Sequence, residues 1–157
     1  MRARFSIAES PHCAAPLVPT FITSTGLRTL SPDTRRGWRV AVQTGTPERR
    51  DVLDGHLWTW REESFLPHGT DEQAFSEEQP VLLTTAPDNA NGATVRFLVD
   101  GAEPPPLDPY ERVIFMFDGH DQSELEAARG HWKRLKDEGH QLTYWQQNND
   151  GRWVKKA

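Results

Sequence analysis

Short apolar runs separated by polar turns recur along the chain from residue 38 onward. Alternating or continuously apolar runs of this length are typical of strands, and the final pair, joined by Asn-Asn-Asp-Gly, is typical of a hairpin. The pattern predicts strands over residues 38–43, 80–84, 95–99, 112–117, 140–145 and 151–156. The run at 112–117 is apolar almost throughout, which predicts a central strand buried on both faces.

Two helices are predicted between these strands. Thr46 as N-cap and Pro47 at the first helical position mark the start of one helix. The other runs from 122 to 138, because Asp121 and Glu124 have capping-box spacing and Gly139 provides a C-terminal stop. Strands that alternate with helices before a final hairpin predict an α/β protein, a single layered domain with a mixed, mostly parallel sheet.

The first 36 residues form an atypical, poorly patterned segment. Prolines interrupt every apolar stretch between residues 11 and 32, so no helix or strand is predicted there. We therefore divide the chain into residues 1–36 and an α/β domain over residues 37–157. Within that domain, the acidic residues 61–79 and the proline-rich residues 100–109 are predicted to be loops.

Charge is unevenly distributed along the chain. The 18 Lys and Arg residues and 23 Asp and Glu residues give a net charge of −5. Residues 51–110 hold two basic and twelve acidic residues, whereas residues 129–157 hold seven basic and three acidic ones. A polyanion such as DNA is not expected to bind over the whole surface, because phosphate binding needs a local excess of cations.

Cysteine content and hydropathy predict the compartment. Cys13 is the single cysteine of the sequence and cannot form an intramolecular disulfide, which fits a reducing cytoplasm. The apolar runs are far shorter than the roughly 20 residues that a membrane helix needs. We therefore expect a cytoplasmic protein without a membrane partner.

The search for catalytic motifs finds little. Gly45-Thr46-Pro47 lacks the further glycines and the Lys-Ser/Thr pair of a phosphate-binding loop, and no serine stands in a Gly-x-Ser-x-Gly motif. We expect no cofactor and no metal, although His68 and His120 are the best candidates for a metal site formed by long-range folding. The second interpretation is a small hydrolase or nucleotide-binding enzyme that uses His68, His120 and Asp118, and it requires these three groups to converge.

The helix predicted at 122–138 carries two parallel stripes of side chains. The apolar stripe comprises Leu125, Ala128, Trp132 and Leu135, and the basic stripe comprises Arg129, Lys133 and Lys136. One interpretation is an ordinary core edge beside solvated cations. The other is a small pocket that accepts an apolar side chain together with a carboxylate, as in recognition of an acidic peptide or a protein C-terminus. The residues alone leave both interpretations open.

A second cluster of aromatic residues spans the end of the first predicted helix and the following loop. It contains Leu57-Trp58-Thr59-Trp60 and Ser64-Phe65-Leu66-Pro67-His68-Gly69. Such a cluster either fills a core or serves as an exposed anchor for a partner protein, because Trp and Tyr dominate interface hot spots. Both clusters favour an adaptor over an enzyme.

Several motifs together resemble the chi subunit family of bacterial DNA polymerase III. The resemblance extends in consistent order over about residues 37–157. It is carried by Leu57-Trp58, Ser64 to Gly69, Gln79-Pro80-Val81-Leu82-Leu83-Thr84, Asn91-Gly92-Ala93, Phe97 to Ala102, Ala128-Arg129, Trp132-Lys133, Gly139 to Gln147, Gly151-Arg152-Trp153 and Lys155-Lys156-Ala157. It implies a Rossmann-like fold without a phosphate-binding loop, in a non-catalytic replication subunit. It also implies two partners, the psi subunit or another clamp-loader component and the acidic C-terminal tail of single-stranded-DNA-binding protein, with DNA contacted only indirectly.

The resemblance assigns candidate residues to both partners. By position, Arg129 and Lys133 belong to the tail pocket, with Trp132 at the place of a family aromatic and Phe117 on the apolar wall. Helical geometry adds Lys136 to this pocket. The psi-facing surface implied by the resemblance comprises Trp58, Phe65, Pro67 and His68.

The chain departs from the family pattern at its start. Family members open with an aromatic-bearing strand and a Leu-rich helix, whereas residues 1–36 here are broken by prolines. We hypothesise that this segment derives from a shifted reading frame or a wrongly assigned start. Peptide mapping of the native protein tests this, and recovery of the N-terminus as written would contradict it.

Overall fold

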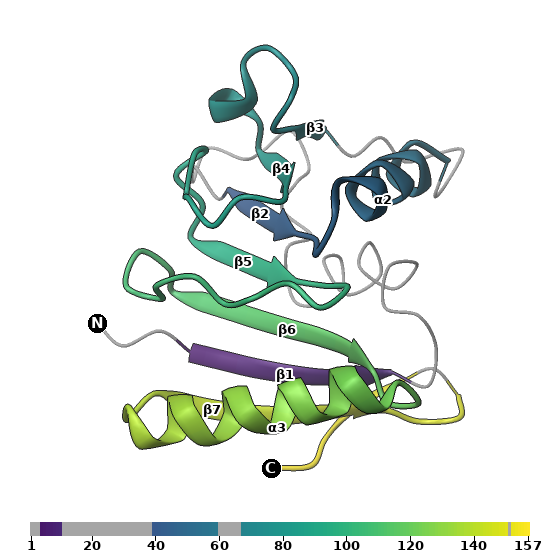
Figure 1. The fold of residues 1–157 in the computed structure, drawn as a ribbon, viewed down its shortest axis with the longest axis vertical. Helices are drawn as coiled ribbons and strands as arrows, with labels where there is room; N and C mark the ends of the chain where they lie inside the picture. Colours follow the sequence, from purple (N-terminus) through teal and green to yellow (C-terminus); the bar gives the residue numbers. More distant parts are fainter. Residues whose placement is uncertain (1–3, 11–38, 60–66, 151) are drawn as a thin grey trace.

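The computed structural model describes residues 4–10, 39–59, 67–150 and 152–157. Its strands form one eight-stranded sheet in the order β3-β4-β2-β5-β6-β1-β7-β8, in which only β7 and β8 pair antiparallel (Figure 1). The elements are β1 (Arg4–Ser10), β2 (Val40–Gln43), α2 (Pro47–Thr59), β3 (Gly69–Thr70), η3 (Ser76–Glu78), β4 (Val81–Thr84), β5 (Val95–Leu98), β6 (Arg112–Asp118), α3 (Gln122–Asp137), β7 (Gln141–Gln147) and β8 (Trp153–Lys155). The predicted α/β class with a mixed, mostly parallel sheet is confirmed.

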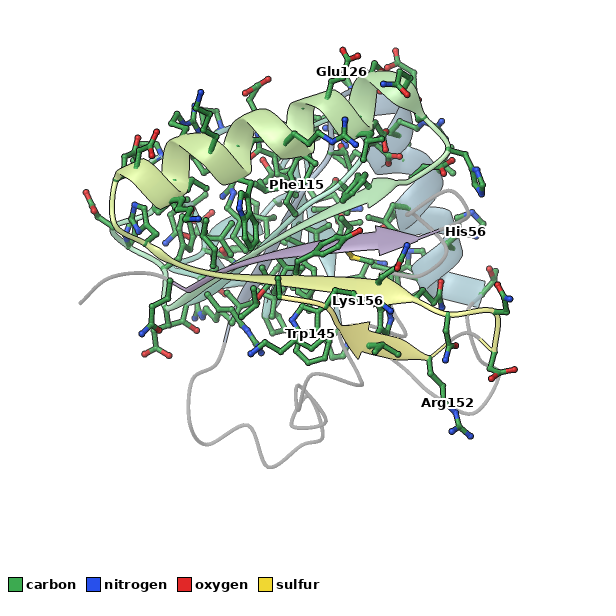
Figure 2. The ribbon with its side chains drawn as sticks, turned by 90° about the horizontal axis from the view of Figure 1, so that it is seen from below. His56, Phe115, Glu126, Trp145, Arg152 and Lys156 are labelled. Carbon is green, nitrogen blue, oxygen red and sulfur yellow. The ribbon has the colours of Figure 1, made fainter. Side chains whose placement is uncertain are left out.

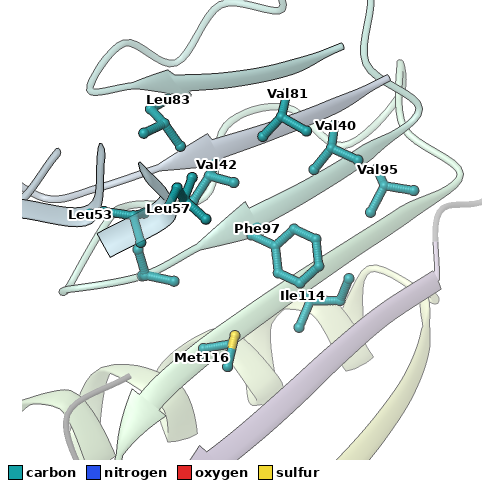
Figure 3. Packing of buried hydrophobic residues seen from close by; sticks show 11 residues of the cluster. Val40, Val42, Leu53, Leu57, Val81, Leu83, Val95, Phe97, Ile114 and Met116 are labelled. Atoms are coloured by element: carbon teal, nitrogen blue, oxygen red, sulfur yellow. The ribbon is translucent and has the colours of Figure 1, made fainter. Parts of the chain in front are cut away.

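Alternation along the strands sends side chains to two separate cores. On one face, Leu53 and Leu57 of α2 pack against Val40, Val42 and other strand residues (Figure 3). On the opposite face, Ala128 and Leu135 of α3 pack against a cluster that includes Phe115 and Phe117. Strand β6 serves both cores, since residues 113–117 are all buried. The prediction of a central strand buried on both faces is therefore confirmed.

Local signals in the sequence explain where the helices begin and end. The Thr46 hydroxyl accepts a hydrogen bond from the Arg49 N–H, and the Asp121 carboxylate accepts from the N–H groups of Ser123 and Glu124, as N-caps do. At the end of α3, Gly139 has φ of 84°. Its N–H donates to the Lys136 carbonyl and the His140 N–H to the Leu135 carbonyl, which is the Schellman arrangement.

Two details of the predicted elements are corrected. Glu124 does not close a capping box with Asp121, because its carboxylate accepts a hydrogen bond from the Asp118 N–H instead. The predicted loop 61–79 contains the short strand β3 and the 3₁₀ helix η3 within its described part. Strand β3 is only two residues long, too short for alternation to reveal it.

The strand β1 was not predicted at all. It lies between β6 and β7 and pairs with both in parallel over residues 4–10. Its sequence, Arg-Phe-Ser-Ile-Ala-Glu-Ser, alternates only over its first residues. Residues 11–38 lie outside the described residues, so the division of the chain at residue 36 stays a prediction.

A buried cation ties the centre of the sheet to its loops. Arg96 of β5 is fully buried and donates hydrogen bonds to Gln43 Oε1, the Tyr110 hydroxyl and the carbonyls of Ala86 and Asp88. Burial lowers the pKa of Arg96, while Tyr110 and Asp88 oppose this effect. Five hydrogen bonds thus join β5 to β2 and to the loops on either side of β5.

We predict that Arg96→Met lowers the free energy of unfolding by about 3 kcal/mol, because it leaves several buried polar groups without hydrogen-bond partners. Urea unfolding measures this change. The matched control is Arg152→Met, which alters an exposed arginine and should change stability by no more than about 0.5 kcal/mol. Equal stability of the two variants would contradict the structural role of Arg96.

Candidate functional site

A pocket of about 450 Å³ lies between α3 and the strands beneath it. Its walls come from β6, α3 and β7, together with the segment that follows β8. The lining residues are Phe117, Leu125, Ala128, Arg129, Trp132, Tyr144 and Ala157. Five of these seven side chains are apolar or aromatic, and Tyr144 adds a hydroxyl. Arg129 is the only charged side chain of this lining.

The helix α3 presents its lining residues at positions i, i+3, i+4 and i+7 from Leu125, which form one face of a helix. The Asp121 cap and the Schellman end fix the two ends of α3, and Leu135 anchors it to the core. Figure 2 shows α3 lying over one face of the sheet, with Phe115 between the helix and the strands. Most of the pocket wall is therefore built on a helix and strands rather than on loops.

The segment after β8 forms the remaining wall. Tyr144 of β7 donates its N–H to the Ala157 carbonyl at 3.0 Å, and its own carbonyl accepts from the Lys156 N–H at 2.8 Å. These bonds continue the antiparallel pairing beyond β8 and hold Ala157 beside the pocket.

Three of the five residues predicted for the tail pocket line it, namely Phe117, Arg129 and Trp132. Lys133 and Lys136 do not, although both are exposed on α3. A helix turns about 100° per residue, so Lys133 points about 100° away from Trp132. Lys136 follows Arg129 by seven residues, about 10.5 Å along the helix axis.

Sequence reasoning did not assign a pocket role to Tyr144 or Ala157. Strand order was the missing information, because β1 pairs with both β6 and β7 and sets Tyr144 level with Phe115. Leu125 and Ala128 were expected on the apolar stripe, and they lie there. Trp132 is half-buried against the core cluster and also lines the pocket. It is therefore both a residue of the core edge and a residue of the pocket, the two interpretations that the sequence left open.

The chemistry of the pocket suits a ligand with an apolar part and an anionic part. Phe117, Leu125 and Trp132 supply apolar surface, and the exposed Arg129 supplies guanidinium donors at the edge. Arginine pairs with carboxylates in a forked geometry that adds specificity to charge. A volume of about 450 Å³ is within the range of small-ligand and peptide side-chain pockets.

Directly beneath this face of α3, His131 is buried with its ring edge-on to Phe115, the ring centroids 5.1 Å apart. Burial lowers the pKa of His131 from its ordinary value of 6.5, with Arg134 acting in the same direction and Glu103 opposing it. The packing of α3 on the sheet therefore favours the neutral imidazole.

The second predicted surface is only partly described. Trp58 on α2 is 58% exposed, and its ring lies 4.8 Å from that of His68. Pro67 is half-buried, and Phe65 lies outside the described residues. The His68 side chain is buried, with Nε2 3.0 Å from Asp54 Oδ1. It therefore packs behind the exposed ring of Trp58 and does not itself face a partner.

The groups required by the enzyme interpretation do not converge. His68 precedes β3, and Asp118 ends β6, four places away in the sheet. At about 4.8 Å per strand this is a separation of roughly 19 Å across the sheet alone. His120 stays near Asp118, whose carboxylate accepts a hydrogen bond from the His120 N–H. Within the described residues, no group of three or more His, Cys, Asp or Glu side chains is arranged to hold a metal ion.

The carboxyl edge of the parallel strands, where α/β folds commonly bind nucleotides, is acidic here. Asp100 follows β5, Asp118 ends β6, and Glu124 lies in the first turn of α3. Burial raises the pKa of Glu124, and the charges of Asp121, Asp100 and Asp118 raise it further against a hydrogen bond from the Asp118 N–H. The charge of Arg49 acts on Asp100 at the same edge, so these carboxyl groups lie together with one arginine.

Comparison with known proteins adds one family. A family model described as DNA polymerase III chi subunit, HolC, matches residues 24–143 of this chain. The comparison with curated proteins finds no match. Among the described residues, none of the helices is long and apolar enough to cross a membrane.

We predict that acid weakens the docking of α3 through His131. Because the folded state holds the pKa of His131 below 6.5, the unfolded state takes up the proton first as pH falls. The stability due to the neutral imidazole is complete above pH 6.5 and is lost between that value and the lower folded pKa.

The measurement is chemical unfolding of the wild type and of His131→Phe between pH 7.5 and 5. The wild type should lose stability relative to the variant as pH falls, because the variant lacks the imidazole whose pKa the fold lowers. A pH-independent difference between the two proteins would contradict this account.

Proposed function

The chain belongs to the DNA polymerase III chi subunit family, and on that premise we propose that it bridges the clamp loader to the C-terminal tail of single-stranded-DNA-binding protein. Membership makes it an accessory subunit of DNA polymerase III, in DNA replication. The bridging role is our proposal, and it assigns one partner to each end of the sheet.

The observation that carries the proposal is the convergence of Phe117, Arg129 and Trp132 in one pocket. The family resemblance implies a ligand that is acidic and ends in an apolar residue with its α-carboxylate. The pocket offers apolar walls for that side chain and the Arg129 guanidinium for the carboxylate. The apolar walls suit the terminal side chain, and the guanidinium suits the carboxylate. Trp132 contributes the aromatic surface typical of interface hot spots.

The acidic residues that precede the end of the tail need a different kind of contact. Lys133 and Lys136 are exposed on α3 outside the pocket, and residues 129–157 carry a net charge of +4 from seven basic and three acidic residues. Exposed charges of this kind accelerate association and depend on salt, but contribute little affinity individually. We assign Lys133 and Lys136 to this attraction and Arg129 to the specific contact.

The clamp-loader partner is assigned to the other end of the sheet. Trp58 lies on α2, which contacts β3 and β4, whereas the tail pocket lies over β6 and β7. From β3 to β7 is six places in the sheet, roughly 29 Å at the usual strand spacing. Two partners bound to these surfaces need not exclude each other. A bridge requires that both bind at the same time. With a net charge of −5, the protein reaches DNA through these partners rather than directly.

We predict that Arg129→Ala or Trp132→Ala weakens binding of a tail peptide by about 1.5–3 kcal/mol, ten-fold or more in affinity, without unfolding the protein. Isothermal titration calorimetry with the full-length protein measures the affinity. The matched control is Arg134→Ala, since Arg134 is an exposed arginine of the same helix outside the pocket. Wild-type affinity in both pocket variants would remove the assignment of this site.

A second prediction separates the two kinds of cation. Lys133→Ala should weaken tail binding less than Arg129→Ala, and the effect should fade as salt rises from about 50 mM toward 500 mM, because exposed charges are screened. The Arg129→Ala effect should persist in larger part, because the forked contact between the guanidinium and a carboxylate in the pocket does not depend on charge alone. If both variants lose their effect equally in high salt, Arg129 makes no specific contact in the pocket.

A further inference from the structure

An exposed phenylalanine stands at the turn between β3 and β4. Phe75 is 67% exposed, the largest exposed fraction among the large hydrophobic residues of the described part. Its backbone has φ of 61° and ψ of 31°, which is the left-handed region. A bulky side chain rarely adopts this conformation, because Cβ approaches the backbone too closely. Such residues persist where the surrounding structure holds them, often at sites of interaction.

The loop that carries Phe75 is held at both of its ends. At the start, the Asp71 carboxylate accepts hydrogen bonds from the Arg50 guanidinium at 2.7 Å and from the Thr84 hydroxyl at 3.0 Å. At the end, Arg39 donates to the Glu77 carbonyl at 2.7 Å, and Asn91 donates to the Gln79 carbonyl at 3.1 Å. Phe75 is thus displayed by an ordered loop, so binding it requires little loss of backbone entropy.

The surroundings of Phe75 are acidic. Glu72, Glu77 and Glu78 are exposed in the same loop, and residues 71–80 contain no Lys or Arg. Among the described residues, Arg50 pairs with Asp71 and Glu72, and Arg39 lies against the loop with its guanidinium on backbone carbonyls, which leaves Glu77 and Glu78 as the exposed carboxylates nearest Phe75. The complementary surface is therefore an apolar pocket rimmed by Lys or Arg.

The position of the loop connects it to the surface around Trp58. Arg50 near the start of α2 binds Asp71 after β3, and Asp54 one turn later binds His68 before β3. The Arg50–Asp71 ion pair and the contact between Asp54 and His68 hold α2 beside the edge strand β3, with Trp58 one turn further along the helix. Figure 1 shows the β3–β4 loop and α2 at the same end of the sheet, far from α3.

We propose that Phe75 is a second aromatic anchor of the surface that binds the clamp loader, and that the contacting clamp-loader subunit offers a basic-rimmed apolar pocket for it. This inference rests on the proposed function and adds the loop 71–79 to the partner surface around Trp58. It also gives that partner a chemistry opposite to that of the acidic tail bound at the other end.

The test uses the full-length protein and the reconstituted clamp loader of the same cell, titrated by calorimetry. Phe75→Asn removes the ring and places a residue that tolerates the left-handed region, so its melting temperature should match or exceed that of the wild type. We expect at least ten-fold weaker clamp-loader binding for Phe75→Asn, near wild-type binding for Phe75→Tyr, and unchanged binding of the tail peptide. The matched control is Val154→Ala, which alters an exposed apolar residue on β8 at the opposite end.

The outcomes separate this inference from the proposed function. Wild-type affinity for Phe75→Asn, together with weakened binding for Trp58→Ala, would overturn the role of Phe75 alone. Wild-type affinity for both variants would remove the whole clamp-loader surface. The alternative is that the loop binds a second copy of this chain, and sedimentation of the isolated protein tests it. Concentration-dependent self-association that Phe75→Asn abolishes would assign the loop to that second copy and overturn the proposal.

Discussion

The packing of α3 on strand β6 is the contact on which the other features of this protein depend. Phe115 and Phe117 point to the α3 face of a strand whose alternate residues, Ile114 and Met116, serve the opposite core. The helix places its apolar stripe on these rings. The same contact leaves a hollow beside Trp132, bounded by β7, in which Arg129 is the single charged side chain of the lining. The pocket that we propose for an acidic, apolar-ended ligand thus follows from how this helix covers the sheet.

Much of this arrangement could be predicted from residue patterns because the signals are local. Capping residues marked both helix starts, the positive-φ glycine marked the end of α3, and helical spacing identified the stripe of Leu125 to Leu135. What failed depended on long-range pairing. Strand β1 has little alternation, and it sets the register between β6 and β7 that brings Tyr144 toward the pocket. Spacing along one helix also grouped three cations, although only Arg129 reaches the lining.

The two ends of the sheet differ in charge as well as in shape. The acidic residues 51–110 include most of α2, together with β3 and the loop of Phe75, whereas the basic residues 129–157 include most of α3 and the final hairpin. The net charge of −5 conceals this polarity. An acidic end suits a basic partner and a basic end an acidic tail, so each proposed partner is attracted to one end and repelled by the other. Exposed aromatic residues at the acidic end and a recessed pocket at the basic end extend the distinction to shape.

On the bridging proposal, one protein molecule holds both partners at once. The most direct test of this proposal immobilises single-stranded-DNA-binding protein with its native tail, adds the full-length protein, and then adds the clamp loader while mass on the surface is recorded. If the protein bridges the two partners, bound mass increases twice in succession, and the second increase is absent when the protein is omitted. A decrease on addition of the clamp loader, or no second increase, would show that the two partners compete or that one of them does not bind, and would contradict the account.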